Sequence, residues 1–164
     1  MSGVTIRRAG PADARDIAAM LSTVLASADT SAILGPVEAE TIRGWMAAAP
    51  ARSRWLVAEG EAGEILGLQW IEPHAGLPDE AANIATFVLP GRQQLGIGSA
   101  LFAATERAAR DVGYVWINAT IRADNEGGLV YYQSRGFRVW TRETGVEIAP
   151  GRVVDRICKR FDLD

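Results

Sequence analysis

The stretch Gln93-Gln-Leu-Gly-Ile-Gly-Ser99 decides the fold, because it joins a predicted strand directly to a predicted helix. Before it, Ile84–Val88 is rich in β-branched and aromatic residues and is followed by Pro90 and Gly91. After it, residues 99–110 are mostly good helix formers. A strand, a turn with two glycines and a helix therefore follow one another without interruption.

The start of this helix is a candidate anion-binding site. The first turn of a helix has unpaired backbone N–H groups and the positive end of the helix dipole, so it attracts phosphate. Gly96 and Gly98 have no Cβ, which lets a large anion approach the backbone closely. The pattern therefore indicates a pyrophosphate-bearing cofactor. The alternative is a turn whose glycines serve only positive φ and close packing.

Two common phosphate-binding motifs do not fit this stretch. No Lys-Ser or Lys-Thr pair follows the glycines, so a nucleoside-triphosphate P-loop is excluded. The third glycine of a dinucleotide-binding fingerprint would fall at Leu101. Neither motif therefore accounts for the glycine turn.

Length and composition describe an ordinary globular protein, and we expect residues 1–164 to form one domain. No apolar stretch is long enough to span a membrane, and residues 1–10 contain no signal-peptide core, which predicts a cytoplasmic protein without a membrane partner. Cys158 is the only cysteine and His74 the only histidine, so we expect no disulfide and no metal site. The net charge of −3 argues against nucleic-acid binding.

Acidic residues are concentrated in the middle of the chain. Residues 55–91 contain six carboxylates and no lysine or arginine. An acidic segment of this kind would suit a cationic amine substrate. The alternative is solvated surface charge.

The remaining elements are predicted from periodicity and turn residues. We expect strands at residues 4–8, 55–59, 65–71, 84–88, 114–120, 137–142 and 153–161, helices at 11–24, 37–49, 99–112 and 126–135, and loops at 27–36, 73–82 and 147–151. The order β-α-α-β-β-β-α-β-α-β-β predicts an α/β (α+β) fold: a mixed, mostly antiparallel sheet with helices on both faces. The helix after the glycine turn makes one parallel βαβ step.

Together, the element order and two motifs resemble the GNAT superfamily of N-acetyltransferases. Gln93, Gly96 and Gly98 match the family's Gln/Arg-x-x-Gly-x-Gly/Ala pattern, with Val88 and Pro90 ahead of it as is usual in the family.

The second motif is an Asn, a Tyr seven residues later and a Gly-Phe pair four residues after the Tyr. Asn125, Tyr132, Gly136 and Phe137 match it. The resemblance covers nearly the whole chain and implies a single-domain GNAT fold.

Within the superfamily the chain is most similar to the phosphinothricin acetyltransferase type. It departs from that subgroup at Asn83, where the subgroup has Glu, and at Tyr132, where the subgroup usually has His. The resemblance implies acetyl-CoA as cosubstrate, no metal, and a homodimer.

The resemblance also implies which residues bind the cofactor. The pyrophosphate would contact the backbone of the glycine turn, with Arg92 and Arg135 nearby, and the pantetheine arm would pair with the free edge of the strand at 84–88. The expected cofactor-binding residues are Phe87, Val88, Arg92, Gln93, Gln94, Leu95, Gly96, Ile97, Gly98, Ser99, Asn125 and Tyr132.

Tyr132 is the candidate general acid, since a phenol can donate a proton to a departing thiolate. The alternative is a core tyrosine with a satisfied hydroxyl group, and its neighbour Tyr131 is expected to pack in the core. Asn125 could bind the pantetheine arm or cap the following helix.

The general base is not identified by a motif. Asn83 has no useful basicity, which leaves Glu72 and Glu80, each able to act through water. His74 has a suitable ordinary pKa but lies in a predicted loop. An acceptor amine with a low pKa would need no base.

These observations predict an acetyl-CoA-dependent N-acetyltransferase that acts by direct attack in a ternary complex. The expected acceptor is the primary amine of a small metabolite, an amino acid or an analogue such as phosphinothricin or methionine sulfoximine. The alternatives are a protein or peptide N-acetyltransferase and a catalytically silent acyl-CoA-binding sensor.

Overall fold

A computed structural model describes residues 3–27, 33, 36–92 and 95–164. It contains one seven-stranded sheet in the order β1-β2-β3-β4-β5-β7-β6, in which only β4 and β5 are parallel. This confirms the predicted mixed, mostly antiparallel sheet and the predicted order of elements. The elements are β1 (Thr5–Arg8), η1 (Pro11–Asp13), α1 (Ala14–Ser27), α2 (Ala39–Ala48), β2 (Arg54–Glu59), β3 (Ile65–Glu72), β4 (Ala81–Val88), α3 (Ile97–Val112), β5 (Trp116–Arg122), α4 (Glu126–Ser134), β6 (Arg138–Ala149) and β7 (Arg152–Asp162).

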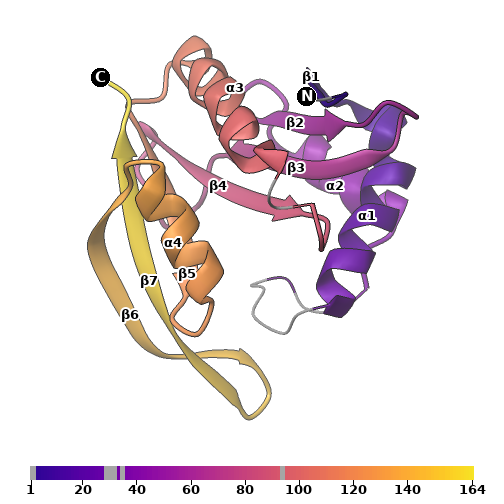
Figure 1. Cartoon of the computed structure of the whole chain (residues 1–164). Helices are drawn as coiled ribbons and strands as arrows, with labels where there is room; N and C mark the ends of the chain where they lie inside the picture. Colours follow the sequence, from indigo (N-terminus) through magenta and orange to yellow (C-terminus); the bar gives the residue numbers. More distant parts are fainter. Residues whose placement is uncertain (1–2, 28–32, 34–35, 93–94) are drawn as a thin grey trace.

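Helices cover both faces of the sheet (Figure 1). Successive side chains of a strand point to opposite faces, and β2 is buried on both. Trp55 and Val57 pack in the cluster formed with α1 and α2, whereas Leu56 and Ala58 pack with residues of α3. A Cβ on Gly67 of β3 would lie 2.7 Å from Ile97 Cγ2, so the absence of a side chain there lets α3 approach the sheet closely.

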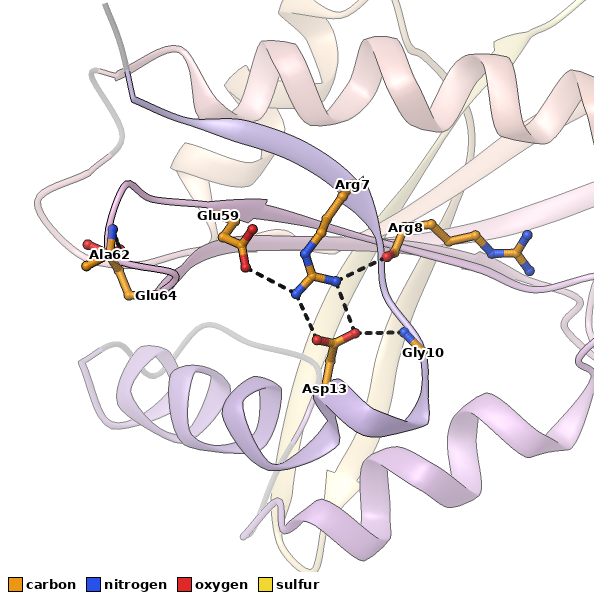
Figure 2. A network of polar contacts seen from close by, with 7 residues as sticks. All are labelled: Arg7, Arg8, Gly10, Asp13, Glu59, Ala62 and Glu64. Carbon is orange, nitrogen blue, oxygen red and sulfur yellow. Dashed lines mark hydrogen bonds and ion pairs between the residues drawn. The ribbon is translucent and has the colours of Figure 1, made fainter.

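An ionic cluster holds β1, β2 and η1 together (Figure 2). Arg7 Nη2 lies 2.8 Å from Asp13 Oδ1 and 3.3 Å from Glu59 Oε2. Asp13 also accepts a hydrogen bond of 2.9 Å from the backbone N–H of Gly10. The hydrogen bond from Arg7 holds the pKa of Asp13 below its usual range, so this carboxylate is charged at neutral pH. The cluster fixes where α1 begins relative to the sheet.

Strands β4 and β5 pair over a short distance only. The register joins Ala81 with Trp116, Ala82 with Ile117 and Asn83 with Asn118. On its other edge β4 stays paired with β3 from Asn83 to Val88. From Ile84 onward the edge of β4 that faces β5 has no strand partner among the described residues, and the two strands diverge.

Several predicted boundaries were wrong: the helix expected at 11–24 continues to Ser27, the strand expected at 114–120 runs from Trp116 to Arg122, and most of the loop expected at 147–151 is strand. Two further differences bear on the sheet. The predicted loop at 73–82 is shorter, because β4 already begins at Ala81, where it pairs with β5. Strand β6 does not end at Arg142 but continues to Ala149, since it pairs with β7 almost to the turn. Gly145, at φ +64°, lies in a register shift that bends this long hairpin, which extends past α4 in Figure 1.

Candidate active site

The glycine turn begins α3 in the way that an anion-binding helix requires. Gly96 is the N-cap of α3 and has φ +72°, a left-handed conformation that glycine adopts without strain. A Cβ on Gly96 would meet nothing within 4 Å, so backbone conformation alone accounts for this glycine. The first backbone N–H groups of α3 have no partners within the helix and are available to a ligand.

Gly98 lies where α3 packs closely against α4, so the close-packing alternative holds for this glycine, while its contact with an anion stays a prediction. A Cβ at this position would lie 2.7 Å from Tyr131 Cε1, so the aromatic ring leaves no room for a side chain here. The Tyr131 hydroxyl also donates a hydrogen bond of 2.7 Å to the Gly98 carbonyl. Tyr131 therefore does more than pack: it attaches α4 to the first turn of α3.

A positive charge lies beside the same turn. Arg135, the C-cap of α4, donates a hydrogen bond of 2.6 Å from Nη1 to Ser99 Oγ. Its Nε is buried and has no hydrogen-bond partner among the described residues. The guanidinium group is thus held where it can complement an anion at the start of α3.

The other predicted residues of the turn lie in different environments. Ile97 is buried in the core beneath α3, so only its backbone faces the turn. Arg92 and Leu95 are exposed, and Gln93 and Gln94 lie outside the described residues.

The Tyr132 side chain is buried, and its hydroxyl lies 2.7 Å from Thr86 Oγ1 of β4. Burial raises the pKa of this phenol, so it carries its proton at neutral pH. The Tyr132 and Phe137 rings meet edge to face at 5.1 Å, and between them Gly136, at φ +105°, turns the chain. This contact explains the spacing of the second motif in physical terms.

Gln69 connects the two tyrosines. It is fully buried on β3, and its Nε2 donates to Thr86 Oγ1 at 2.9 Å and to the Tyr131 hydroxyl at 3.1 Å. Thr86 and Gln69 are partners in the β3–β4 register. One polar network therefore runs from Tyr132 through β4 and β3 to the first turn of α3.

Asn125 caps α4. Its Oδ1 accepts a hydrogen bond of 3.0 Å from the backbone N–H of Gly128. The capping alternative is therefore confirmed, while a contact between Asn125 and a cofactor stays a prediction.

A second polar row crosses the opposite face of the sheet where β4 and β5 begin to diverge. Glu72 of β3 is the register partner of Asn83. Asn118 Nδ2 of β5 donates to Asn83 Oδ1 at 2.9 Å, and Trp140 Nε1 of β6 donates to Asn118 Oδ1 at 2.8 Å. Because Trp70, two residues before Glu72, packs against the α1–α2 cluster, this row shares the α1–α2 face.

The candidate bases differ in their surroundings. Burial raises the pKa of Glu72, while hydrogen bonding to Trp70 and the charge of His74 oppose this rise. Glu80 is exposed and accepts a hydrogen bond of 3.0 Å from Trp116 Nε1, so its carboxylate is already engaged in structure. His74 lies on an exposed loop, where its Nδ1 accepts from the backbone N–H of Gly76.

The residues fit an acyl-CoA cofactor at three places. The free edge of β4 offers backbone groups to an amide-bearing arm, α3 presents its N-terminus, and Arg135 supplies charge. Within the described residues no group of His, Cys, Asp or Glu side chains could hold a metal ion. None of the described helices is long and apolar enough to cross a membrane.

Sequence reasoning missed Gln69, Thr86, Asn118 and Trp140. Gln69 did carry a signal, because it is the one strongly polar residue within the apolar run from Ile65 to Ile71. Trp140 carried none, since its partner Asn118 comes from a distant strand.

We predict that Gly98→Ala destabilises the fold by about 1–3 kcal/mol, because the new methyl group overlaps the Tyr131 ring. Urea unfolding of Gly98→Ala, Tyr131→Ala and the double variant measures this as a double-mutant cycle. Most of the cost should vanish in the Tyr131→Ala background, where the space is free. Equal costs in both backgrounds would show that the glycine serves something other than Tyr131.

Comparison with known proteins agrees with this geometry. Residues 51–139, more than half of the chain, match the acetyltransferase (GNAT) domain family. A mycothiol acetyltransferase of Nocardiopsis dassonvillei is 33% identical over 104 residues, which are 60% of this chain and 31% of that protein; the chain thus spans about a third of that relative's length. YwnH of Bacillus subtilis, to which phosphinothricin acetyltransferase activity is ascribed, is 25% identical over 98% of this chain and 95% of its own.

Solved structures show the same fold. A phosphinothricin acetyltransferase from Sinorhizobium meliloti in complex with acetyl-CoA superposes with a TM-score of 0.83 at 18% identity, covering 98% of this chain and 88% of its own. The chain therefore belongs to the GNAT family of acetyltransferases.

Proposed function

We propose that this protein transfers the acetyl group of acetyl-CoA to the primary amine of a small metabolite, an amino acid or an amino-acid analogue. The observation that carries the proposal is the divergence of β4 from β5 after Asn83. The opening has the protonated Tyr132 on one face of the sheet and Glu72 on the other. A donor held in this opening and an acceptor arriving from the Glu72 face could meet directly in a ternary complex.

The cofactor would be held by backbone groups and by few side chains. The backbone from Leu95 to Ser99 and the guanidinium of Arg135 would hold the pyrophosphate, with Arg92 and residues 93–94 beside them. The free edge of β4 at Phe87 and Val88 would bind the amide groups of the arm, and Asn125 would lie near it. When bound, acetyl-CoA supplies the acetyl group as a reactive thioester.

Tyr132 would serve as the general acid. Its hydroxyl proton stays in place at neutral pH because burial disfavours the tyrosinate. Phe137 and Thr86 fix the ring and the hydroxyl, so the proton at Oη has a defined position. A positioned proton of this kind is what a leaving thiolate requires.

Glu72 would serve as the general base, through water if needed. It lies across from Asn83, the position where the phosphinothricin-type subgroup has its glutamate, so a carboxylate remains at this point of the site. Its raised pKa makes it a better proton acceptor than an exposed carboxylate. Glu80 is the weaker candidate because its carboxylate accepts from Trp116.

The surroundings of Glu72 support a small amine as acceptor. On the same face the rings of Trp45, Trp70 and Phe87 form a row, with centroids 5.8 Å and 5.9 Å apart. A carboxylate beside an aromatic row suits an ammonium group on a compact, partly apolar body. We also propose that residues 1–164 act as one domain, while the homodimer and the cytoplasmic location stay predictions.

The proposal predicts that small primary amines are acetylated with higher kcat/KM than short peptides. Thiol release from acetyl-CoA, measured over amino acids, their sulfoximine and phosphinic analogues, polyamines and peptides, tests this. Peptides that outcompete every small amine would indicate a peptide acetyltransferase. Tight acetyl-CoA binding without thiol release for any amine would indicate a sensor.

Tyr132→Phe should lower kcat by roughly 10²-fold, because it removes the proton held at Oη and leaves the ring in place. The affinity for acetyl-CoA, measured by calorimetry, should change little. The Tyr114→Phe variant is the matched control, since its hydroxyl bonds to the Arg52 carbonyl away from this network. Full turnover in Tyr132→Phe would mean that the phenol only packs.

Glu72→Gln should lower kcat/KM by roughly 10²-fold for amines of high pKa. The base acts when ionised. Wild-type activity should therefore increase as the pH rises through the raised pKa of Glu72, and it should be lost as the pH falls below that pKa. This decrease of activity at low pH should be absent from the pH–rate profile of Glu72→Gln and present in that of Glu80→Gln. An unchanged decrease at low pH in Glu72→Gln would remove Glu72 from the reaction.

A further inference from the structure

Four side chains between α4 and the sheet form a hydrogen-bond chain whose direction can be deduced. The members are Tyr131, Gln69, Thr86 and Tyr132, joined by contacts of 2.7–3.1 Å. The chain ends at the Gly98 carbonyl, 2.7 Å from the Tyr131 hydroxyl. A carbonyl can only accept, and this fixes the donors as far as Thr86.

The first step concerns Tyr131. Its single O–H proton is used on the Gly98 carbonyl, so its oxygen can only accept from Gln69. The Gln69 side chain must therefore present Nε2, not Oε1, to Tyr131. The orientation of this buried amide follows from the position of a backbone carbonyl on α3.

The second step concerns Thr86. The same Nε2 carries a second proton and lies 2.9 Å from Thr86 Oγ1, so Thr86 accepts from Gln69. The Thr86 proton is then free to point at Tyr132 Oη, 2.7 Å away. If Tyr132 receives this bond, its own proton remains available to another acceptor.

We propose that Thr86 and Gln69 are positioning residues for acetyl transfer: Thr86 donates to Tyr132 Oη, so that the Tyr132 proton points to the leaving thiolate. The same bond stabilises the negative charge that forms on Oη once the proton has gone. No atom beyond that proton changes place, because Thr86 and Gln69 keep their own. The inference rests on the proposed function, in which Tyr132 is the acid.

The hydrogen-bond chain also connects Tyr132, the proposed acid, to the glycine turn. Gly98 lies in the first turn of α3, and its carbonyl fixes the donors from Tyr131 to Thr86. Formation of this turn therefore orients the acid, which links binding at the turn to readiness for proton transfer.

Thr86→Val and Thr86→Ser form a matched pair of tests. Valine keeps the shape of threonine but cannot donate, whereas serine keeps the hydroxyl. Thr86→Val should lower kcat by roughly 10-fold to 100-fold, the range expected for losing a hydrogen bond to a charged group. The KM for acetyl-CoA should stay within about twofold, and Thr86→Ser should retain most of the wild-type kcat.

A measurement without turnover uses the free enzyme with tyrosine labelled with ¹³C at Cζ. The chain has three tyrosines, and the Tyr132 signal is the one lost in Tyr132→Phe. Thr86→Val should displace the Tyr132 signal, Thr86→Ser should not, and the Tyr114 signal should stay in place as an internal control.

Gln69→Glu independently tests the direction in which the hydrogen bonds of this network are donated. A carboxylate accepts from Thr86, turns the Thr86 proton away from Tyr132 and should reproduce the kcat loss and signal displacement of Thr86→Val. Gln69→Glu with wild-type kcat and an unmoved Tyr132 signal would overturn the inferred direction.

The roles of Tyr132 and Thr86 can be tested separately. Wild-type kcat in Tyr132→Phe would overturn the role of Tyr132 in the proposed function. Low kcat in Tyr132→Phe together with full kcat and an unmoved signal in Thr86→Val would overturn only the inference.

Discussion

The site depends on the short pairing between β4 and β5. Three register pairs hold the strands together, and beyond them β3 is the only partner of β4 among the described strands. Unpaired backbone groups inside a protein are costly unless water or a ligand satisfies them. An opening in the middle of a seven-stranded sheet therefore calls for an extended, amide-bearing partner. Every other feature of the site is arranged around this opening.

The point of divergence is closed by side chains as well as by backbone. The amide of Asn118 donates to that of Asn83 at the last register pair and accepts from Trp140. A glutamate at position 83 would place a charge against the nearly buried Asn118. With Asn83, the Asn83–Asn118 pair is neutral and hydrogen-bonded. The nearest carboxylate in this row is that of Glu72, on the neighbouring strand β3.

Local patterns predicted much of the fold. The glycine turn, the Asn125 cap and the Gly136 turn are set by backbone conformation and neighbouring residues, so the sequence showed them. The full length of the β6–β7 hairpin was missed because pairing with β7, a non-local contact, decides where β6 ends. The Gln69–Thr86–Tyr132 network was missed for the same reason, since it joins three elements far apart in the chain. Gly98 shows most clearly what local patterns leave out. The motif identified its position, but the Tyr131 ring that leaves no room for a side chain there belongs to another helix.

The adjacent tyrosines of α4 divide two tasks that a single residue could not perform. The Tyr131 hydroxyl donates its one proton to the Gly98 carbonyl and cannot donate a second hydrogen bond. Tyr132, one position on, turns its ring toward Phe137 and its hydroxyl toward Thr86. A helix rotates successive side chains by about 100°, which lets one turn of α4 reach both α3 and β4. Tyr131 thus attaches α4 to the first turn of α3, and Tyr132 attaches it to β4.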